Sequence, residues 1–337
     1  MLSRALEAKP RWSPSPRYGD NISCKLGSIL EYSDEDCLVG FIDDMPLVFC
    51  GNNTESHLTL REILRASVAV MGESRLGMTE KAVLLEGKIY AVKRFRNVCV
   101  GRREFGKRVE RLARVSQKCD YLVPVRAYLY AKRIKFVLSE YYPMGSLADL
   151  LSAGRQFGHT ALDWHQRLMI ALDIARAIAF VHTQCPPYEK KMQMNVHGNI
   201  KASNVMINSN FSACLSDYGL AQLAEIEEVS DTWQRKPPPY MQPEYIYSDE
   251  CCQKSDIYNF GIILLDMLGG PMNCIIERKE EIKRGKIQFF EFSVQGKEKQ
   301  QALKVLDIAL ACKNVSPDAR PSIEQILEYF GDVISTK

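Results

Sequence analysis

Residues 195–204 read NVHGNIKASN, and the stretch SDYGL follows at 216–220. The two stretches bring four polar side chains close together in the chain: His197, Lys201, Asn204 and Asp217. Asn204 and Asp217 offer the hard oxygen ligands that Mg²⁺ requires. Asn199 lies between the histidine and the lysine, and its amide can orient a hydroxyl but cannot take a proton at neutral pH. The sequence therefore indicates a loop that could hold a metal ion.

The composition is that of a soluble globular protein. Hydrophobic residues make up 46% and charged residues 25% of the 337 positions, enough for one large two-lobed domain or two ordinary domains. The net charge of +3 is only mildly basic and gives no reason to expect nucleic acid as a partner.

The 11 cysteines are scattered, and no pair has CxxC spacing. This pattern fits neither a zinc site nor a disulfide framework, so we expect reduced, intracellular thiols. The longest apolar runs, 168–181 and 257–270, carry Asp173, Arg176 and Asp266, which favours buried helices over membrane spans. The N-terminus has no signal-peptide pattern.

Residues 1–57 contain many turn formers and few periodic segments, and 9–20 is rich in Pro and Arg, so we expect a partly disordered N-terminal arm. After it, 57–67 has helical spacing, and short β-rich runs follow. A helical pattern at 101–117 separates the second and third of these runs. The β-rich runs are SVAVMG (67–72), KAVLLEGKIYAVKRFR (81–96) and KRIKFVLSEYY (132–142).

After residue 145 the pattern becomes helical. Four segments have helical patterns: 162–184, 254–270, 300–315 and 322–330. A sheet-rich part followed by a helix-rich part predicts an α+β fold with a small β-rich N-lobe and a larger helical C-lobe.

The run VMGESRLGMTEKA (70–82) has glycines at 72 and 77, which would let backbone amides approach phosphate oxygens, although it also fits an ordinary hairpin turn. Lys93 lies in the β-rich YAVKRF, where a buried ammonium needs a partner. Glu110 on the next helix is a candidate, and a Lys–Glu pair of this kind would position nucleotide phosphates. Alone, Lys93 also fits a surface lysine with a buried stem.

Further elements follow in a fixed order, which makes the whole pattern specific although no single motif is. After the loop at 195–204 come YMQPEY, with Pro243 and Glu244, then KSDIYNFG, with Asp256, and PDARPS, with Arg320.

Across about residues 58–332 the chain resembles the protein-kinase superfamily. More narrowly it is similar to the intracellular part of plant leucine-rich-repeat receptor-like kinases, in the subgroup described as probable inactive receptor kinases. The stretches that carry this resemblance include LREILRAS, LVPVRAYLYA, GSLADLL, LDWHQRLMIALDIARAIAFVH, VHGNIKASNV and LDIALACKNVSPDARPS.

The resemblance implies a kinase fold with nucleotide between the lobes. It divides the chain into a juxtamembrane-like N-terminal arm (1–57), an N-lobe (58–139), a C-lobe (140–332) and a short C-terminal tail (333–337). It also implies ATP and Mg²⁺ as cofactors and signalling proteins, including an active kinase, as partners. The location it implies is the cytoplasm, at the inner face of the plasma membrane.

The family's roles can be carried over where the residues match. Lys93 would reach the α- and β-phosphates and Glu110 would hold it, while Lys201 would face the γ-phosphate. Asn204 and Asp217 would hold Mg²⁺. The remaining implied nucleotide contacts are the hairpin positions Gly72, Ser74, Gly77 and Thr79, the adenine-sandwiching Ala91 and Met206, and Glu140 and Tyr141 in the hinge between the lobes. Three implied structural roles are a Glu244–Arg320 pair, Asp256 as a brace of the catalytic loop, and Ser139 as a small gatekeeper beside adenine.

Several positions depart from the family pattern. Ser74 replaces the middle glycine of the hairpin, and Thr79 replaces a valine that covers adenine. Gly198 replaces the arginine of the H-R-D motif, so Ser230 and Thr232 in the activation segment lack that cationic partner. Most important, Asn199 replaces the aspartate that accepts the proton of the substrate hydroxyl.

Loss of a general base lowers a rate by roughly 10²–10⁴. Phosphoryl transfer depends largely on positioning and charge stabilisation, however, and the lysines and metal ligands are present. Three hypotheses follow: a pseudokinase that binds ATP and acts as a scaffold, a weak Ser/Thr kinase in which another group or solvent takes the proton, and a purely structural protein with a closed nucleotide site.

Overall fold

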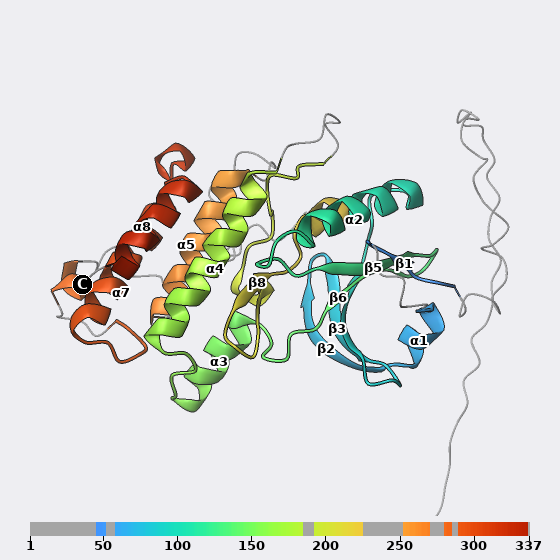
Figure 1. Cartoon of the computed structure of the whole chain (residues 1–337), viewed down its shortest axis with the longest axis horizontal. Coiled ribbons are helices and arrows are strands. Elements are labelled where there is room, and N and C mark those ends of the chain that lie inside the picture. Colours follow the sequence, from blue (N-terminus) through green and yellow to red (C-terminus); the bar gives the residue numbers. More distant parts are fainter. Residues whose placement is uncertain are drawn as a thin grey trace, which may run out of the picture. The chain divides into compact units, whose positions relative to one another are not determined.

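A computed structural model describes residues 45–51, 58–184, 192–224, 252–269, 280–284 and 289–335. The N-terminal part of this region is an antiparallel sheet with strand order β1-β5-β6-β4-β3-β2 (Figure 1). The bounds are β1 Val48–Phe49, β2 Ser67–Ser74, β3 Gly77–Val83, β4 Ile89–Phe95, β5 Val125–Tyr130 and β6 Lys135–Glu140. This sheet forms the N-lobe that the sequence predicts.

Strand β1 changes the interpretation of the N-terminal arm. Val48 and Phe49 pair with Tyr128 and Ala127 of β5, so this two-residue strand of the arm belongs to the sheet. Leu47 is buried in the core under that sheet. The part of the arm nearest the lobe is therefore structural, whereas residues 1–44 and 52–57 lie outside the described residues.

Two helices cover the two faces of the sheet. Helix α1 (Leu60–Arg65) begins with a capping box in which Thr59 and Glu62 satisfy each other's backbone N–H groups, and it buries Leu60 and Ile63. Helix α2 (Arg102–Ser116) packs on β5 through an apolar face that is fully buried. Because strand side chains alternate between faces, each helix receives its own apolar set.

The C-lobe is helical, as predicted (Figure 1). Its helices are α3 Leu147–Phe157, α4 Trp164–His182, α5 Gln253–Gly269, α7 Gly296–Cys312 and α8 Ile323–Ser335. A short β-pair, β7 Val205–Ile207 with β8 Ala213–Leu215, lies beside α4, and three 3₁₀ turns, η3 Ala202–Asn204, η4 Leu220–Leu223 and η6 Pro317–Ala319, connect elements. Capping boxes begin α3 and α4.

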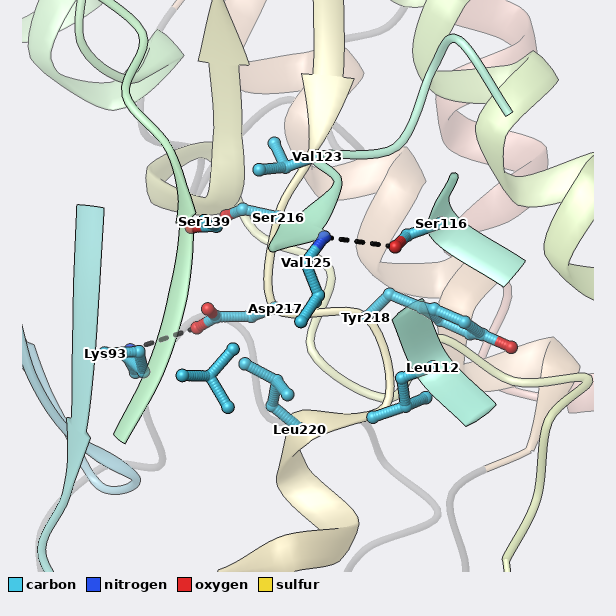
Figure 2. A pocket seen from close by; sticks show the side chains of 11 residues that line it. Lys93, Leu112, Ser116, Val123, Val125, Ser139, Ser216, Asp217, Tyr218 and Leu220 are labelled. Atoms are coloured by element: carbon cyan, nitrogen blue, oxygen red, sulfur yellow. Dashed lines mark hydrogen bonds and ion pairs between the residues drawn. The ribbon is translucent and has the colours of Figure 1, made fainter. Parts of the chain in front are cut away.

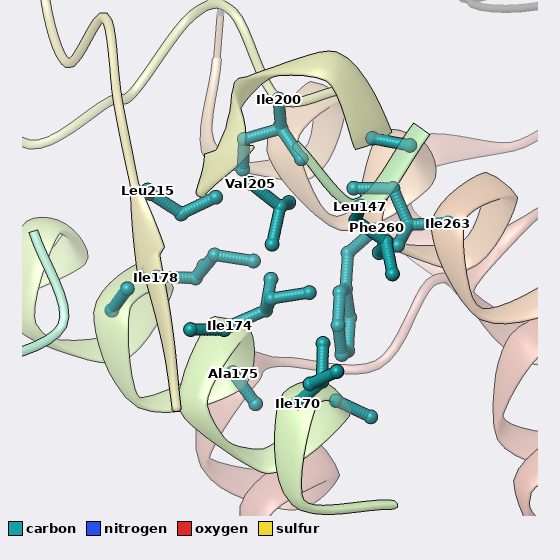
Figure 3. Packing of buried hydrophobic residues seen from close by; sticks show 14 of the residues in the cluster. Leu147, Ile170, Ile174, Ala175, Ile178, Ile200, Val205, Leu215, Phe260 and Ile263 are labelled. Carbon is teal, nitrogen blue, oxygen red and sulfur yellow. The ribbon is translucent and has the colours of Figure 1, made fainter. Parts of the chain in front are cut away.

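The C-lobe core joins α4 and α5 to the loop of interest. Figure 3 shows apolar side chains of α4, α5, β7 and β8 in one cluster, which includes Phe260 of α5, a fully buried residue. Ile200, from the loop at 195–204, enters the same cluster, so the loop is anchored by apolar packing as well as by hydrogen bonds.

Arg320 is the largest fully buried side chain of the described chain. Its guanidinium donates to the carbonyl oxygens of Asn314 and Lys254, both at 2.8 Å, which satisfies a charge that would otherwise be costly to bury. Glu244, the predicted partner of Arg320, lies outside the described residues, as do Pro243, Ser230 and Thr232. No described helix has both the length and the apolar character needed to cross a membrane.

Candidate nucleotide-binding site

The carboxylate of Asp256 on α5 holds the backbone of the loop at 195–204. The Asp256 carboxylate accepts the backbone N–H of His197 at 2.8 Å and that of Gly198 at 3.0 Å, and it lies 3.1 Å from Nε2 of His182. The expected role of Asp256 as a brace of the loop is confirmed. Gly198 has φ +74°, a conformation that is unfavourable for residues with a Cβ, so this departure from the family pattern also removes backbone strain.

His197 is a structural residue of this loop. Its ring is fully buried beside Tyr218, and Nδ1 accepts the backbone N–H of Asn199 at 3.3 Å. Burial lowers the pKa of His197, although the carboxylates of Asp256 and Asp217 oppose that shift. A neutral imidazole therefore holds the backbone of Asn199 in place.

Asn199 points its side chain at the predicted metal ligand. Its Nδ2 donates to Oδ2 of Asp217 at 3.4 Å, and the backbone carbonyl oxygen of Asn199 accepts Nδ2 of Asn204 at 2.8 Å. An aspartate in the same place could not donate this bond and would instead set two carboxylates against each other. The amide thus adds a hydrogen bond to Asp217 that does not depend on a metal ion.

Lys93 reaches across the site to the same carboxylate, as Figure 2 shows. Its Nζ lies 3.0 Å from Oδ2 of Asp217, and the ammonium also donates to Oγ of Ser74 at 3.3 Å and to Oγ1 of Thr79 at 3.1 Å. The alternative of an exposed lysine is excluded, because the Lys93 side chain is buried. The hydroxyl groups of Ser74 and Thr79 are therefore hydrogen-bond acceptors of the buried Lys93 ammonium.

The predicted pair between Lys93 and Glu110 is absent from the structure. Glu110 is exposed on α2, and its Oε1 accepts the hydroxyl of Tyr128 at 3.0 Å. Gly106, one turn earlier on the same face of α2, makes room for that hydroxyl, since a Cβ there would lie 2.6 Å from it. This arrangement directs Glu110 toward Tyr128 of β5, and no ion pair joins it to Lys93.

Apolar side chains fill the space between Lys93 and α2. Leu220 of η4 and Leu112 of α2 point into this space (Figure 2), and Arg108 holds η4 by donating Nη1 to the carbonyl oxygen of Gln222 at 2.9 Å. A cavity of about 30 Å³ remains, which holds about one or two water molecules. It is lined by Lys93, Leu112, Ser116, Val123, Val125, Val137, Ser139, Ser216, Asp217, Tyr218 and Leu220.

Asp217 itself has φ +63°, an uncommon conformation for a residue with a side chain. Gly219 follows at φ +67°, where a Cβ would lie 2.4 Å from Leu112. The backbone of SDYGL is thus pressed against α2, with the Tyr218 hydroxyl donating to the carbonyl oxygen of Met194 at 2.5 Å. Such strain at a polar site is typical of functional segments.

The two hairpin glycines have different reasons to be glycine. Gly77 has φ +141°, and a Cβ there would lie 1.9 Å from the carbonyl oxygen of Arg94, so close packing of β3 on β4 requires it. Gly72 has open space around it, which suits the approach of a ligand. Only Gly72 therefore keeps the freedom that the predicted phosphate contact needs.

The two residues predicted to sandwich adenine lie on different strands, one in the sheet of the N-lobe and one in the β-pair of the C-lobe. Ala91 is buried in β4 opposite Ser139 of β6, and Met206 is buried in β7. Met206 packs with Val123, Tyr142 and Cys214, and Met71 of the hairpin strand covers this group. The sequence prediction did not include Met71 and Tyr142 in the site. The signal that could have identified them is that they are the chain neighbours of Gly72 and Tyr141, which were predicted to contact nucleotide.

The hinge residues have partners of their own. Glu140 forms an ion pair with Arg126 of β5. The ring of Tyr141 lies under the ammonium of Lys81, which is 4.6 Å from the ring centroid, a cation–π contact. These contacts fix the segment that leads from the sheet into the C-lobe.

The residues present fit a magnesium–nucleotide complex. The amide nitrogen of Asn204 is engaged with Asn199, which leaves its oxygen as the ligating atom, and Asp217 has a second carboxylate oxygen beside the one that Lys93 contacts. Two protein oxygens completed by phosphates and water are a usual share for Mg²⁺. Burial lowers the pKa of Lys201; the carboxylate of Asp217 opposes this shift, and the positive charges of Lys93 and Arg75 add to it.

Comparisons with known proteins support the fold and the family. The family model described as protein tyrosine and serine/threonine kinase matches residues 68–330. A probable inactive receptor kinase of Arabidopsis thaliana is 31% identical over 94% of this chain and 49% of its own length. An inactive leucine-rich repeat receptor-like serine/threonine-protein kinase of the same plant is 33% identical over 85% of this chain and 44% of its own. The chain thus spans about half the length of these relatives.

Two solved structures are similar to the whole fold. The pseudokinase domain of an immune regulator of the RLK/Pelle family has a TM-score of 0.71 at 26% identity, covering 87% of this chain and 91% of that one. The maize sucrose-induced receptor kinase 1 domain, bound to AMP-PNP, has a TM-score of 0.69 at 28% identity, covering 84% and 98%. The predicted α+β, two-lobed class is confirmed, and the chain belongs to the protein tyrosine and serine/threonine kinase family.

Proposed function

We propose that this domain is a pseudokinase that binds ATP and acts as a regulatory or scaffolding module in receptor-type signalling. The observation that carries the proposal is the bond from Asn199 Nδ2 to Asp217. At the position where the family places a proton acceptor, this chain has a side chain that donates a hydrogen bond to a metal ligand.

The chemical consequence follows from the amide. A hydroxyl that attacks a phosphoryl group must lose its proton, and an amide oxygen can orient the hydroxyl without accepting that proton. The expected loss is roughly 10²–10⁴ in rate, relative to kinase turnover numbers of about 1–100 s⁻¹. The domain is then left with nucleotide binding as its main property at this site.

Nucleotide binding requires the polar network to open. Lys93 would leave Ser74 and Thr79 to contact the phosphates, and Asn204 with Asp217 would hold Mg²⁺. When bound, the metal would neutralise phosphate charge. The positive charge around Lys201 favours an anionic ligand in this place.

Signalling proteins, including an active kinase, are the partners we propose, at the inner face of the plasma membrane. The similar receptor kinases support this role, because a domain of this kind occupies about half of their length. The names of these relatives include the word inactive, which fits a binding role better than turnover.

A second candidate is a weakly active Ser/Thr kinase that transfers the γ-phosphate of ATP to protein hydroxyls. It is favoured by the presence of Lys93 within 3.0 Å of Asp217 and of Asn204 beside Asn199. These groups supply the positioning and charge that dominate phosphoryl transfer. A permanently closed structural protein is the third candidate, favoured by the satisfied network around Lys93.

Incorporation of labelled γ-phosphate into the protein and into a generic substrate separates the first two candidates. The control is Lys93→Met, which removes the phosphate-binding ammonium. Pseudokinase function predicts equal incorporation by both proteins, and turnover above the control would establish the weak kinase instead. Asn199→Asp should raise any measurable turnover by roughly 10²–10⁴ if only the base is missing.

Thermal denaturation with ATP and Mg²⁺ tests the third candidate. Binding at a hundred times the dissociation constant stabilises a protein by about 2.7 kcal/mol, which is readily measured. A rise in melting temperature that Lys93→Met abolishes would support nucleotide binding at this site. No rise at saturating nucleotide would favour the closed structural protein.

A further inference from the structure

One side of α2 carries a line of positive charge. Five basic residues recur at spacings of four, four, three and four along the helix and into its C-terminal turn: Arg103, Lys107, Arg111, Arg114 and Lys118. At about 100° per residue they fall within an arc of about 80°, so they form one row, here called the basic stripe. Arg111 is half-buried, and the other four members are exposed.

The basic stripe has no carboxylate partner in the part of the chain that the structure describes. No ion pair of any of its five members is formed with a described residue, whereas Arg94, Arg108 and Arg126 each pair with a glutamate. Like charges four residues apart on a helix are destabilising, by about 0.2–0.5 kcal/mol per pair in isolated helices. The exposed Glu110 lies beside the row, three residues after Lys107 and four before Arg114, and offsets one of its five charges, so the stripe remains a net cluster of positive charge on the described fold.

The opposite side of α2 is used for packing. Phe105, Val109 and Leu112 are fully buried against the sheet and η4, and no large apolar side chain of α2 is exposed. A helix that enters a membrane interface presents apolar side chains beside its basic ones. Because α2 has none available, its outer side offers charge alone.

We propose that the basic stripe is a docking surface for an acidic segment of a protein partner, one that carries closely spaced carboxylates or phosphates. Stripe members four residues apart are about 6 Å apart along the axis, which is close to the distance of about 6.7 Å between alternate residues of an extended chain. An extended segment laid along α2 could thus meet successive basic residues with every second side chain.

The chemistry of the stripe fits such a segment. Three of its members are arginines, whose planar guanidinium binds carboxylates and phosphates through two parallel hydrogen bonds. A row confined to a narrow arc matches an extended chain, whereas a flat anionic surface would be better matched by charges spread over a broad face. None of the five stripe residues is among the predicted nucleotide contacts.

The experiment is fluorescence anisotropy of the full chain with a labelled twelve-residue peptide in which glutamate alternates with glycine, and with the phosphoserine version. The stripe variant is Arg103→Gln/Lys107→Gln/Arg111→Gln. The matched control, Arg133→Gln/Lys297→Gln/Lys299→Gln, removes the same charge from exposed positions elsewhere. We expect the stripe variant to weaken binding about tenfold or more and the control about twofold or less, with weaker binding at higher salt.

Three results would overturn the proposal. Equal weakening by both variants would mean that only net charge matters. Binding of anionic phosphatidylserine vesicles that the stripe variant loses, without peptide binding by the wild-type chain, would assign the stripe to a membrane. A fall of several degrees in the melting temperature of the stripe variant alone would mean that the chain covers the stripe itself; an unchanged or slightly raised melting temperature supports the docking surface, because repulsion is relieved.

Discussion

Tyr128→Phe tests whether the hydroxyl of Tyr128 holds Glu110 away from the nucleotide site. The substitution removes the donor of the 3.0 Å bond to Glu110 Oε1 and leaves the ring in its contact with Phe105, at 5.9 Å between centroids. Burial and the nearby Glu110 raise the pKa of Tyr128, so the hydroxyl is a protonated donor at neutral pH. We therefore expect Glu110 to be released toward solvent and toward Lys93.

The magnitude follows from the exposure of the acceptor. Hydrogen bonds to charged groups contribute about 1.5–3 kcal/mol, but the typical net value for any hydrogen bond, about 1 kcal/mol, applies here because the exposed Glu110 regains water. This energy corresponds to a factor of about five in the balance between the two orientations of Glu110. ATP affinity should rise by up to that factor if the Lys93–Glu110 pair favours binding.

Isothermal titration of ATP and hydrogen exchange of α2 measure the effect. The matched control is Tyr130→Phe on the same strand, because the Tyr130 hydroxyl donates to the carbonyl oxygen of Val100 at 3.2 Å and not to Glu110. We expect tighter ATP binding and faster exchange in α2 for Tyr128→Phe only. Equal effects of both substitutions, or an unchanged effect of Tyr128→Phe in a Glu110→Gln background, would refute the reasoning.

Three further predictions concern the polar network and the loop. Asn199→Asp should lower the free energy of unfolding by about 2–4 kcal/mol in EDTA, because it opposes Asp217, and Mg²⁺ should restore most of it; urea titrations with and without Mg²⁺ measure both. Replacing Ser74 by Gly together with Thr79 by Val removes two acceptors of the buried ammonium, so stability should fall by about 1–2 kcal/mol while ATP affinity rises, measured by melting and titration. The pKa of His197 is lowered from its ordinary value of 6.5, so only the unfolded chain binds that proton; the free energy of unfolding should fall as pH drops below about 6.5, by at most about 1.4 kcal/mol per unit, and less steeply in His197→Gln.

The fold could be predicted where apolar periodicity is long. The helix expected at 162–184 is α4, and its start is set by the capping box of Asp163, while the helix expected at 254–270 is α5. Strands β1 and β5 and helix α3 were not predicted. Strand β1 has only two residues, and it forms because its backbone pairs with β5, which lies far away in the sequence. A strand this short has no periodic pattern of apolar residues that could predict it.

The orientation of α2 shows what sequence spacing cannot determine. Spacing places Glu110 on α2, but whether its side chain reaches Lys93 depends on how the helix packs on β5 and η4. Gly106 was a usable signal, because a glycine inside a helix is unfavourable by about 1 kcal/mol and often marks a close approach by another group. Here that group is the hydroxyl of Tyr128.

Three departures from the family pattern act on the same two charged groups. Ser74 and Thr79 contact the ammonium of Lys93, and Asn199 donates to the carboxylate of Asp217. The family residues expected there, glycine, valine and aspartate, would supply no hydroxyl to the lysine and would place a second negative charge beside Asp217. Each substitution therefore stabilises the Lys93–Asp217 pair in the absence of nucleotide and metal, since buried charges persist only when they are paired and hydrogen-bonded. A site built in this way keeps its folded geometry without ligand, so a nucleotide would have to displace internal bonds to enter. Asn199 thus accounts both for the loss of the proton acceptor and for part of the stability without ligand.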